Sequence, residues 1–308
     1  MPAHKVIIDT DPGVDDAMAI LFACLHEEID LLGLTTVFGN VTIDMATRNA
    51  LALLEVAGLD APVAEGAAQP LVQPPRPPAT DIHGPEGLGD EPRQTPQTRA
   101  DPRSAARFIC DMADRYPGEI ALCPVGPLTN LALAMDLDSD ICAKVKSVTV
   151  MGGSIWEGGN ATPHAEANFW QDPHAAEKVL AAPWDITLVG LDVTHRIIGS
   201  PDDFAGLADV SPRIGGFLNR VVPFYMRFHD ANDGFYGSYM HDPSAVISIL
   251  HPELFTMEPH PVTVAVEGEE IGRSLITRSG NRPAVNVCAA VDQAAVMNVF
   301  RETIARGA

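Results

Sequence analysis

The feature of this chain that most limits its fold is the alternation between short apolar runs and longer stretches with helical periodicity. Several of the short runs are apolar at nearly every position, as strands covered on both faces are. The runs lie at 5–10, 30–38, 119–125, 146–152 and 185–191, and the helical patterns occupy roughly 15–26, 42–57, 102–116, 127–136 and 172–181. This alternation predicts an α/β protein with a Rossmann-like, mostly parallel central sheet and helices on both faces.

Residues 70–98 interrupt the alternation with many prolines and few apolar side chains. Because the α/β pattern resumes beyond them, they are interpreted as a surface loop or flap inside one domain that covers residues 1–308. After residue 192 we expect a helix near 211–229, another after Asp242, and a last one from Asp292 to about Arg306. Late strands are expected in PVTVAVE and AVNVCAAV, and a hairpin through GRSLITR is left open.

The charge and the cysteines exclude several classes of partner. A formal net charge of −21 repels phosphate backbones and anionic lipids, so a small-molecule partner is expected, with no nucleic acid and no membrane. The five cysteines are widely spaced and form no CxxC pair, which argues against disulfides and a zinc site. The chain shows neither a signal peptide nor an apolar run of membrane-spanning length, so we expect a cytoplasmic location.

An acidic cluster follows the first predicted strand. In KVIIDTDPGVDDA, residues 5–17, four aspartates fall within eight positions: Asp9, Asp11, Asp15 and Asp16. In an open parallel sheet, ligands bind beyond the carboxyl ends of the strands. One of these aspartates could merely cap the helix that begins there, but four carboxylates together after a buried strand predict a bound cation. Since only oxygen donors are offered, the ion should be Ca²⁺ or Mg²⁺.

Further polar groups follow the next strands at the same rim of the predicted sheet. TTVFGN ends in Asn40, VGPLTN offers the carbonyl of Val125, and SYMHDPSAV places His241 beside Asp242 before a helix. The loop after the fourth strand adds side chains that suit a polyhydroxylated ligand, namely Asn160, Glu166 and Asn168. Each motif alone is typical of a turn, a helix cap or a surface loop. Together at one rim they predict a binding site.

The motifs, taken in order, resemble those of the nucleoside hydrolases of the inosine-uridine-preferring type: DTDPGVDDA, TVFGN, VGPLTN, VMGG, AEANFWQDPHAA and MHDP. The resemblance extends from the first strand to about residue 250. It implies the nucleoside hydrolase fold, one Ca²⁺ per subunit, and a homodimer or homotetramer. It also implies hydrolysis of the N-glycosidic bond of ribonucleosides to ribose and free nucleobase. It does not assign a preference between purine and pyrimidine bases.

The resemblance also implies roles for single residues. The expected calcium ligands are Asp11, Asp16, the Val125 carbonyl and Asp242. Asp11 is also the expected general base for a metal-bound water, and His241 matches the histidine near the nucleobase. Because an imidazole titrates near neutral pH and His241 stands beside Asp242, we expect His241 to be the acid for the departing base. The expected substrate contacts are Asp15, Asn40, His83, Met151, Asn160, Glu166 and Asn168.

Two other functions remain open. A phosphohydrolase of the haloacid-dehalogenase type also places DxD after its first strand, but here Pro-Gly follows Asp11 and no GDxxxD appears later. A Ca²⁺-dependent nucleoside- or ribose-binding protein without turnover would keep the metal ligands, but the presence of both Asp11 and His241 favours catalysis. Tyr225, Phe228 and His229 on one predicted helix could reach a base, although an aromatic helix face more often belongs to the core.

Overall fold

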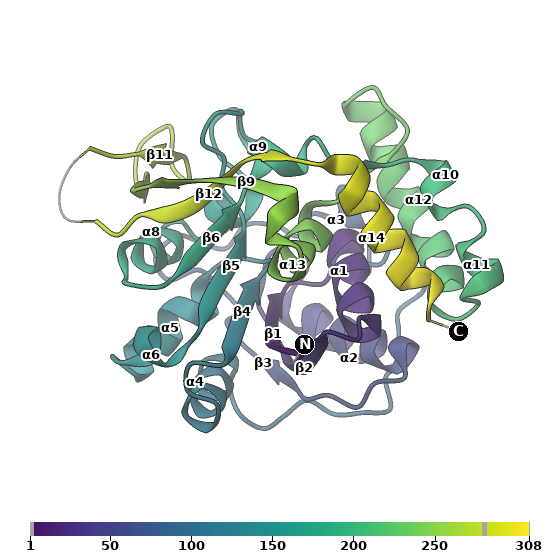
Figure 1. The fold of residues 1–308 in the computed structure, drawn as a ribbon, viewed down its shortest axis with the longest axis horizontal. Coiled ribbons are helices and arrows are strands. Elements are labelled where there is room, and N and C mark those ends of the chain that lie inside the picture. Colours follow the sequence, from purple (N-terminus) through teal and green to yellow (C-terminus); the bar gives the residue numbers. More distant parts are fainter. Residues whose placement is uncertain (1–2, 279–281, 308) are drawn as a thin grey trace.

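The centre of the computed structural model, which describes residues 3–278 and 282–307, is an eight-stranded sheet (Figure 1). Its strand order is β3-β2-β1-β4-β5-β6-β12-β9, and every neighbouring pair is parallel except β12 and β9. The strands are β1 (His4–Thr10), β2 (Ile29–Thr36), β3 (Val63–Glu65), β4 (Ile120–Pro124), β5 (Ser147–Met151), β6 (Ile186–Val189), β9 (Phe255–His260) and β12 (Val285–Val291). The predicted mostly parallel sheet is confirmed.

Helices cover both faces of this sheet, as predicted (Figure 1). One face carries α1 (Val14–Leu25), α2 (Ile43–Ala57), α12 (Ile214–Asn232), α13 (His241–Leu250) and α14 (Gln293–Ala305). The other carries α4 (Ala105–Arg115), α5 (Thr129–Leu137), α6 (Ile141–Lys144) and α8 (Pro173–Ala181). Shorter helices lie in the connections: α3 (Thr80–His83), α7 (Ala167–Gln171), α9 (Leu191–Thr194), α10 (Pro201–Phe204), α11 (Leu207–Val210) and the 3₁₀ turn η1 (Pro252–Leu254). Among the described residues, no helix is both long and apolar enough to cross a membrane.

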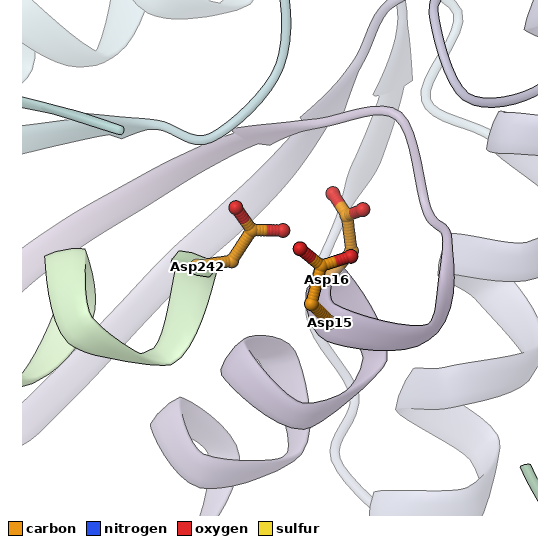
Figure 2. Close-up of side chains that lie close together, drawn as sticks. All are labelled: Asp15, Asp16 and Asp242. Atoms are coloured by element: carbon orange, nitrogen blue, oxygen red, sulfur yellow. The ribbon is translucent and has the colours of Figure 1, made fainter. Parts of the chain in front are cut away.

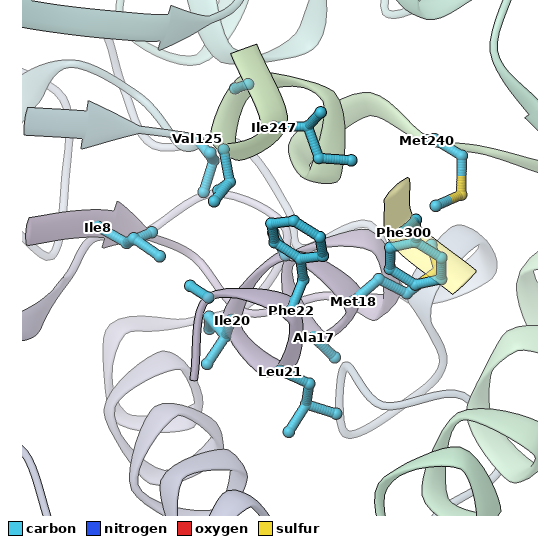
Figure 3. Packing of buried hydrophobic residues seen from close by; sticks show 14 of the residues in the cluster. Ile8, Ala17, Met18, Ile20, Leu21, Phe22, Val125, Met240, Ile247 and Phe300 are labelled. Atoms are coloured by element: carbon cyan, nitrogen blue, oxygen red, sulfur yellow. The ribbon is translucent and has the colours of Figure 1, made fainter. Parts of the chain in front are cut away.

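Two apolar cores form because side chains of the central strands alternate between the faces of the sheet. In β1, Val6 and Ile8 join one core, and Ile7 joins the other. The first core is centred on α1, where Phe22 is fully buried and stacks on Phe300 of α14 with ring centroids 6.2 Å apart (Figure 3). This packing holds α1, and therefore the acidic residues at its start, against the sheet.

The late elements agree with the sequence prediction in part. β12 lies within AVNVCAAV and joins the central sheet. The strand in PVTVAVE does not join it: β10 (Val262–Val264) pairs instead with β11 (Ser274–Ile276) in a separate antiparallel hairpin, which confirms the hairpin through GRSLITR. The edge strand β9 was not predicted because its sequence, FTMEPH, mixes exposed polar residues with a proline and has no apolar run.

The segment 70–98, all of it described, contains the single helical turn α3 and otherwise neither helix nor strand. It lies near the site because its His83 packs against α12, stacking on Tyr225 with ring centroids 5.4 Å apart. A two-stranded pair, β7 (Ile198–Gly199) with β8 (Ser238–Tyr239), completes the same region.

Candidate active site

The carboxyl ends of β1, β2, β4 and β5 border a cavity of about 590 Å³. Its lining comes from α1, from segment 70–98, from the loop and helix around α7, and from α12 and α13. Ten of the predicted site residues line it: Asp15, Asn40, His83, Val125, Met151, Asn160, Glu166, Asn168, His241 and Asp242. The remaining two, Asp11 and Asp16, lie beneath the lining and are only 1% and 0% exposed.

A cluster of carboxylates forms the floor of this region. Asp15 and Asp16 in the first turn of α1 and Asp242 in the first turn of α13 point toward one another (Figure 2). One oxygen atom from each of the three lies within 4.8 Å of the other two. Asp11 adjoins them, since its backbone N–H donates to Asp16 Oδ1 at 3.3 Å. The turn in DPGVDD thus places Asp11 next to Asp15 and Asp16, and α13 adds Asp242.

Asp16 is both a helix cap and a member of the cluster. Its Oδ2 accepts hydrogen bonds from Gly13 N at 2.9 Å, at the start of α1, and from Asn40 Nδ2 at 3.1 Å. Its Oδ1 accepts one from Thr10 Oγ1 at 2.5 Å. The capping role expected as an alternative is therefore real, but it does not exclude metal binding, because the same carboxylate faces Asp242.

Asp11 is held in a cradle of glycines. Its Oδ2 accepts a hydrogen bond from Asn40 N at 2.6 Å, whereas its Oδ1 is buried without a hydrogen-bond partner in the described chain. A Cβ atom at Gly39 would lie 2.0 Å from Oδ2, and one at Gly126 would lie 2.5 Å from Oδ1. Only glycine at these two positions leaves room for the carboxylate.

The charges of this cluster are not compensated by the protein alone. Burial, reinforced by the neighbouring carboxylates, raises the pKa of Asp11, Asp15 and Asp242 well above the usual range, and burial also raises the pKa of Asp16. Asp15 Oδ1, like Asp11 Oδ1, is buried without a hydrogen-bond partner among the described residues, and it lies 3.8 Å from Nδ1 of the neutral His83 ring. Crowded carboxylates with free oxygens and an oxygen-only donor set fit a hard divalent cation such as Ca²⁺.

The loop before α7 and the helix itself carry the polar wall of the cavity. Glu166, the N-cap of α7, accepts hydrogen bonds from Gly153 N at 2.9 Å, Asn168 N at 2.8 Å and Phe169 N at 3.1 Å. Burial nevertheless raises the pKa of Glu166 to about 7. Asn168 donates from Nδ2 to the carbonyl of Val125 at 2.8 Å, which orients that carbonyl and uses one of its lone pairs.

Further contacts order the remaining predicted residues. The side-chain oxygen of Asn160 accepts a hydrogen bond from Ala167 N at 2.9 Å. The carbonyl of Met151 accepts one from Asn168 Nδ2 at 3.2 Å. The Nδ1 atom of His83 accepts from Val14 N at 3.2 Å, so the ring proton resides on Nε2. Burial lowers the pKa of His83 to about 3, which keeps this imidazole neutral.

The opposite end of the cavity is rich in imidazole and aromatic rings. His241 Nδ1 lies 2.8 Å from Thr194 Oγ1, and burial together with neighbouring imidazoles lowers the pKa of His241 well below its usual value. Tyr225, Phe228 and His229 line the cavity, so this face of α12 does not belong to the core alone.

Several lining residues were not singled out in the sequence, among them Trp170, Gln171, His195, Asp233 and Tyr239. His195 follows α9, and Tyr239 lies in the two-residue strand β8. Neither position has a periodic pattern around it, so only the fold brings them to the site. Trp170 and Gln171 stand in the AEANFWQDPHAA motif, which was the available signal for them.

Comparison with known proteins agrees with this geometry. Residues 6–298 match the sequence model of the family described as inosine-uridine preferring nucleoside hydrolase. The chain is 43% identical over 280 residues to uridine nucleosidase 1 of Arabidopsis thaliana, covering 91% of this chain and 83% of that protein. It is 39% identical over 268 residues to the inosine-uridine preferring nucleoside hydrolase of Leishmania major, covering 86% and 84%.

Solved structures of nucleoside hydrolases also resemble this chain. A plant nucleoside hydrolase superposes with a TM-score of 0.95 at 35% identity, covering 98% of this chain and 99% of that one. A purine-preferring ribonucleoside hydrolase from Gardnerella vaginalis superposes with a TM-score of 0.94 at 30% identity, covering 98% of each chain.

Proposed function

Because this chain belongs to the inosine-uridine preferring nucleoside hydrolase family and is a ribonucleoside N-glycosyl hydrolase, we propose that its activity depends on Ca²⁺ and on Asp11 as general base. The products are ribose and a free nucleobase. The observation that carries the proposal is the buried cluster of Asp15, Asp16 and Asp242 beside the unpaired Oδ1 of Asp11.

The proposed ligands of Ca²⁺ are Asp11, Asp16, Asp242 and the carbonyl of Val125. All four groups offer hard oxygen donors, and the excess negative charge of the cluster supports a divalent cation. When bound, the cation supplies positive charge that lowers the pKa of a water molecule and orients it. Asp15 lies in the same cluster and could also bind the ion, but we propose that it binds the sugar instead.

Asp11 has the geometry of a general base. Its Oδ2 is fixed by Asn40 N, and its Oδ1 keeps an unused lone pair among the described residues. Asp11 Oδ1 takes the proton of the attacking water while the water oxygen bonds to the anomeric carbon and the bond to the base breaks. The surrounding carboxylates stabilise the positive charge that develops on the ribose ring.

The sugar is held by polar groups around this centre. Asp15, whose Oδ1 has no hydrogen-bond partner among the described residues, is proposed to bind ribose hydroxyls together with Asn40 and Asn168. The proposed contacts with the rest of the sugar come from His83, Met151, Asn160 and Glu166, which all line the cavity. Fixing the sugar in this way aligns the anomeric carbon with the water.

His241 is the proposed catalytic residue on the leaving-group side. Thr194 occupies its Nδ1, so Nε2 remains for the base. If the Thr194 hydroxyl donates to Nδ1, the neutral ring carries its proton on Nε2 and can donate a hydrogen bond to the departing base.

Binding through Asp15 predicts a strong requirement for the 2′-hydroxyl. A buried carboxylate left without its partner lowers affinity for the transition state about tenfold or more, so the kcat/KM of deoxyuridine should be at least about tenfold lower than that of uridine. Equal kcat/KM values for deoxyuridine and uridine would show that Asp15 does not bind the 2′-hydroxyl.

Ribose release from inosine, uridine, cytidine, adenosine and guanosine, measured with Ca²⁺ and after exhaustive chelation, tests the proposal. Release that stops on chelation and returns with Ca²⁺ supports it. Tight nucleoside binding without turnover would favour a binding protein, and phosphate release from phosphomonoesters would favour a phosphohydrolase. A homodimer or homotetramer and a cytoplasmic location remain predictions.

A further inference from the structure

One imidazole of the cavity has a carboxylate partner that the reaction described above does not use. His229 Nδ1 lies 2.6 Å from Asp233 Oδ2, one helical turn further along at the end of α12. The carboxylate can only accept, so the proton of this bond resides on Nδ1. The other ring nitrogen, Nε2, is buried and has no hydrogen-bond partner among the described residues. His229 therefore lines the cavity with a ring whose orientation is fixed by Asp233 and whose second nitrogen has no hydrogen-bond partner among the described residues.

Aromatic rings surround this imidazole. Phe235 stacks on it at 5.5 Å with an interplanar angle of 6°, while Tyr225 and Tyr239 meet it edge-on at 4.4 Å and 4.7 Å. Rings of this kind fix the plane of His229, and the stacked face attracts an imidazolium more than a neutral imidazole. The cage and the carboxylate both favour a positioned, protonated ring.

We propose that His229, oriented by Asp233, delivers the proton that the nucleobase takes up as it departs. This inference rests on the proposed hydrolysis of ribonucleosides. It assigns His241 the hydrogen bond that orients the base, and it assigns His229 the proton transfer itself.

The partners of the other imidazoles support this division. His83 Nδ1 accepts a backbone N–H, so that ring is held neutral, and the partner of His241 is a hydroxyl group. Among the described imidazoles that line the cavity, only His229 is hydrogen-bonded to a carboxylate. The transferred proton is the one on Nε2, so water that enters the cavity after the base departs restores it, while Nδ1 keeps its proton in the hydrogen bond to Asp233.

The charges around His229 act in both directions. Burial lowers its pKa, and the hydrogen bond with Asp233 opposes this effect. The titratable groups that face it from neighbouring elements are His83 of α3, His195 after α9, Tyr225 of α12, Tyr239 of β8 and His241 of α13. Asp233 is the carboxylate bonded to it, and loss of that charge should lower the pKa of His229 further.

The proposed step balances. The bond between the anomeric carbon and the base nitrogen breaks, and its electron pair goes to the base. The Nε2 proton of His229 passes to the base, which leaves as a neutral molecule. The attacking water gives its oxygen to the anomeric carbon and one proton to Asp11. Asp11 then releases that proton to solvent, and His229 regains one from solvent.

A comparison of two leaving groups tests the inference. Uracil and hypoxanthine need a proton to depart from uridine and inosine, whereas p-nitrophenolate leaves p-nitrophenyl β-riboside without one. A His229→Gln variant should lose about 100-fold or more in kcat on uridine or inosine. Its loss on p-nitrophenyl riboside should be at least tenfold smaller.

Asp233→Asn provides a second variant that keeps the ring in place. Its kcat on uridine should fall, and the decline of kcat at rising pH should begin at lower pH than in the wild type. Asp230→Asn is the matched control, because Asp230 lies exposed on the same helix. His241→Gln is measured in parallel.

Each other outcome has a defined meaning. Equal losses on both leaving groups in His229→Gln, or a selective loss in His241→Gln alone, would overturn the inference and leave the proposed function standing. An unchanged pH profile in Asp233→Asn would also overturn it. A wild-type enzyme inactive on all three substrates would instead overturn the proposed function, and the inference with it.

Discussion

Glu166→Gln should change how the stability of the metal-free protein depends on pH. The Glu166 carboxylate is 2% exposed, and burial raises its pKa to about 7 from the 4.5 of a free side chain. Since the folded state binds this proton more tightly than the unfolded state, Glu166 makes the protein less stable as pH rises from about 4.5 to about 7, and the loss is complete above that range.

The magnitude follows from the pKa difference of about 2.5 between the values of about 7 and 4.5. At ~1.4 kcal/mol per pKa unit, the charged side chain lowers the free energy of unfolding by ~3 kcal/mol at pH 8 relative to pH 4.5. Glutamine has nearly the same shape but does not titrate. In the variant, the glutamine amide faces backbone N–H groups that donate hydrogen bonds to the carboxylate in the wild type. The loss of these hydrogen bonds destabilises the variant by an amount that does not depend on pH.

The measurement is the free energy of unfolding by urea at several pH values from 4.5 to 8, with chelator present throughout. The difference between Glu166→Gln and the wild type should move by ~3 kcal/mol in favour of the variant across that range. Glu267→Gln, at an exposed position, serves as the control and should show a much smaller change. A Glu166→Gln difference that stays constant within ~0.5 kcal/mol from pH 4.5 to 8 would refute the reasoning.

Three further predictions concern the site. Gly126→Ala places a Cβ 2.5 Å from Asp11 Oδ1 and should weaken Ca²⁺ binding at least about tenfold by calorimetric titration. Gly216→Ala is the control, because its Cβ would lie 4.0 Å from the nearest neighbour and should leave the affinity unchanged. Equal affinities of the two variants would show that Asp11 does not need the space at Gly126. Thr194→Val removes the partner of His241 Nδ1 and should lower kcat on uridine about fivefold with little change in KM, and an unchanged kcat would show that the hydroxyl is dispensable. Ca²⁺ at about 100 times its Kd should raise the Tm by roughly 5 °C over chelated protein, so identical melting curves would argue against a site in the folded state.

The sheet and the rim motifs could be predicted because each depends on local sequence. The buried strands are apolar throughout, and the acids of DTDPGVDD follow the first strand directly, so the parallel sheet brings them to its carboxyl edge. The sequence could not reveal that β10 leaves the central sheet while β12 joins it, because short apolar runs contain no information on their pairing partners.

The leaving-group end of the cavity was harder to predict. His195 and Tyr239 come from segments without periodicity, and only the β7–β8 pair brings them to α12. His229 and Asp233, in contrast, are four residues apart, which is the spacing at which side chains meet on a helix, although the predicted helix near 211–229 ended before Asp233. That spacing could have been used to predict a contact between the two side chains, and the structure shows a hydrogen bond between them.

The acidic cluster illustrates how the fold and the proposed chemistry depend on one another. Asp15 and Asp16 occupy the first turn of α1, and Asp242 that of α13, where helix dipoles and free N–H groups favour negative charge. Burial nevertheless raises the pKa of each, so these helix ends do not offset the loss of hydration. The remaining compensation has to be positive charge from outside the chain. A bound dication supplies it in the resting enzyme, on our proposal, and the ribose ring supplies more as its bond to the base breaks. Because the protein itself does not neutralise the negative charge of these aspartates, the site binds the positively charged transition state better than the neutral substrate.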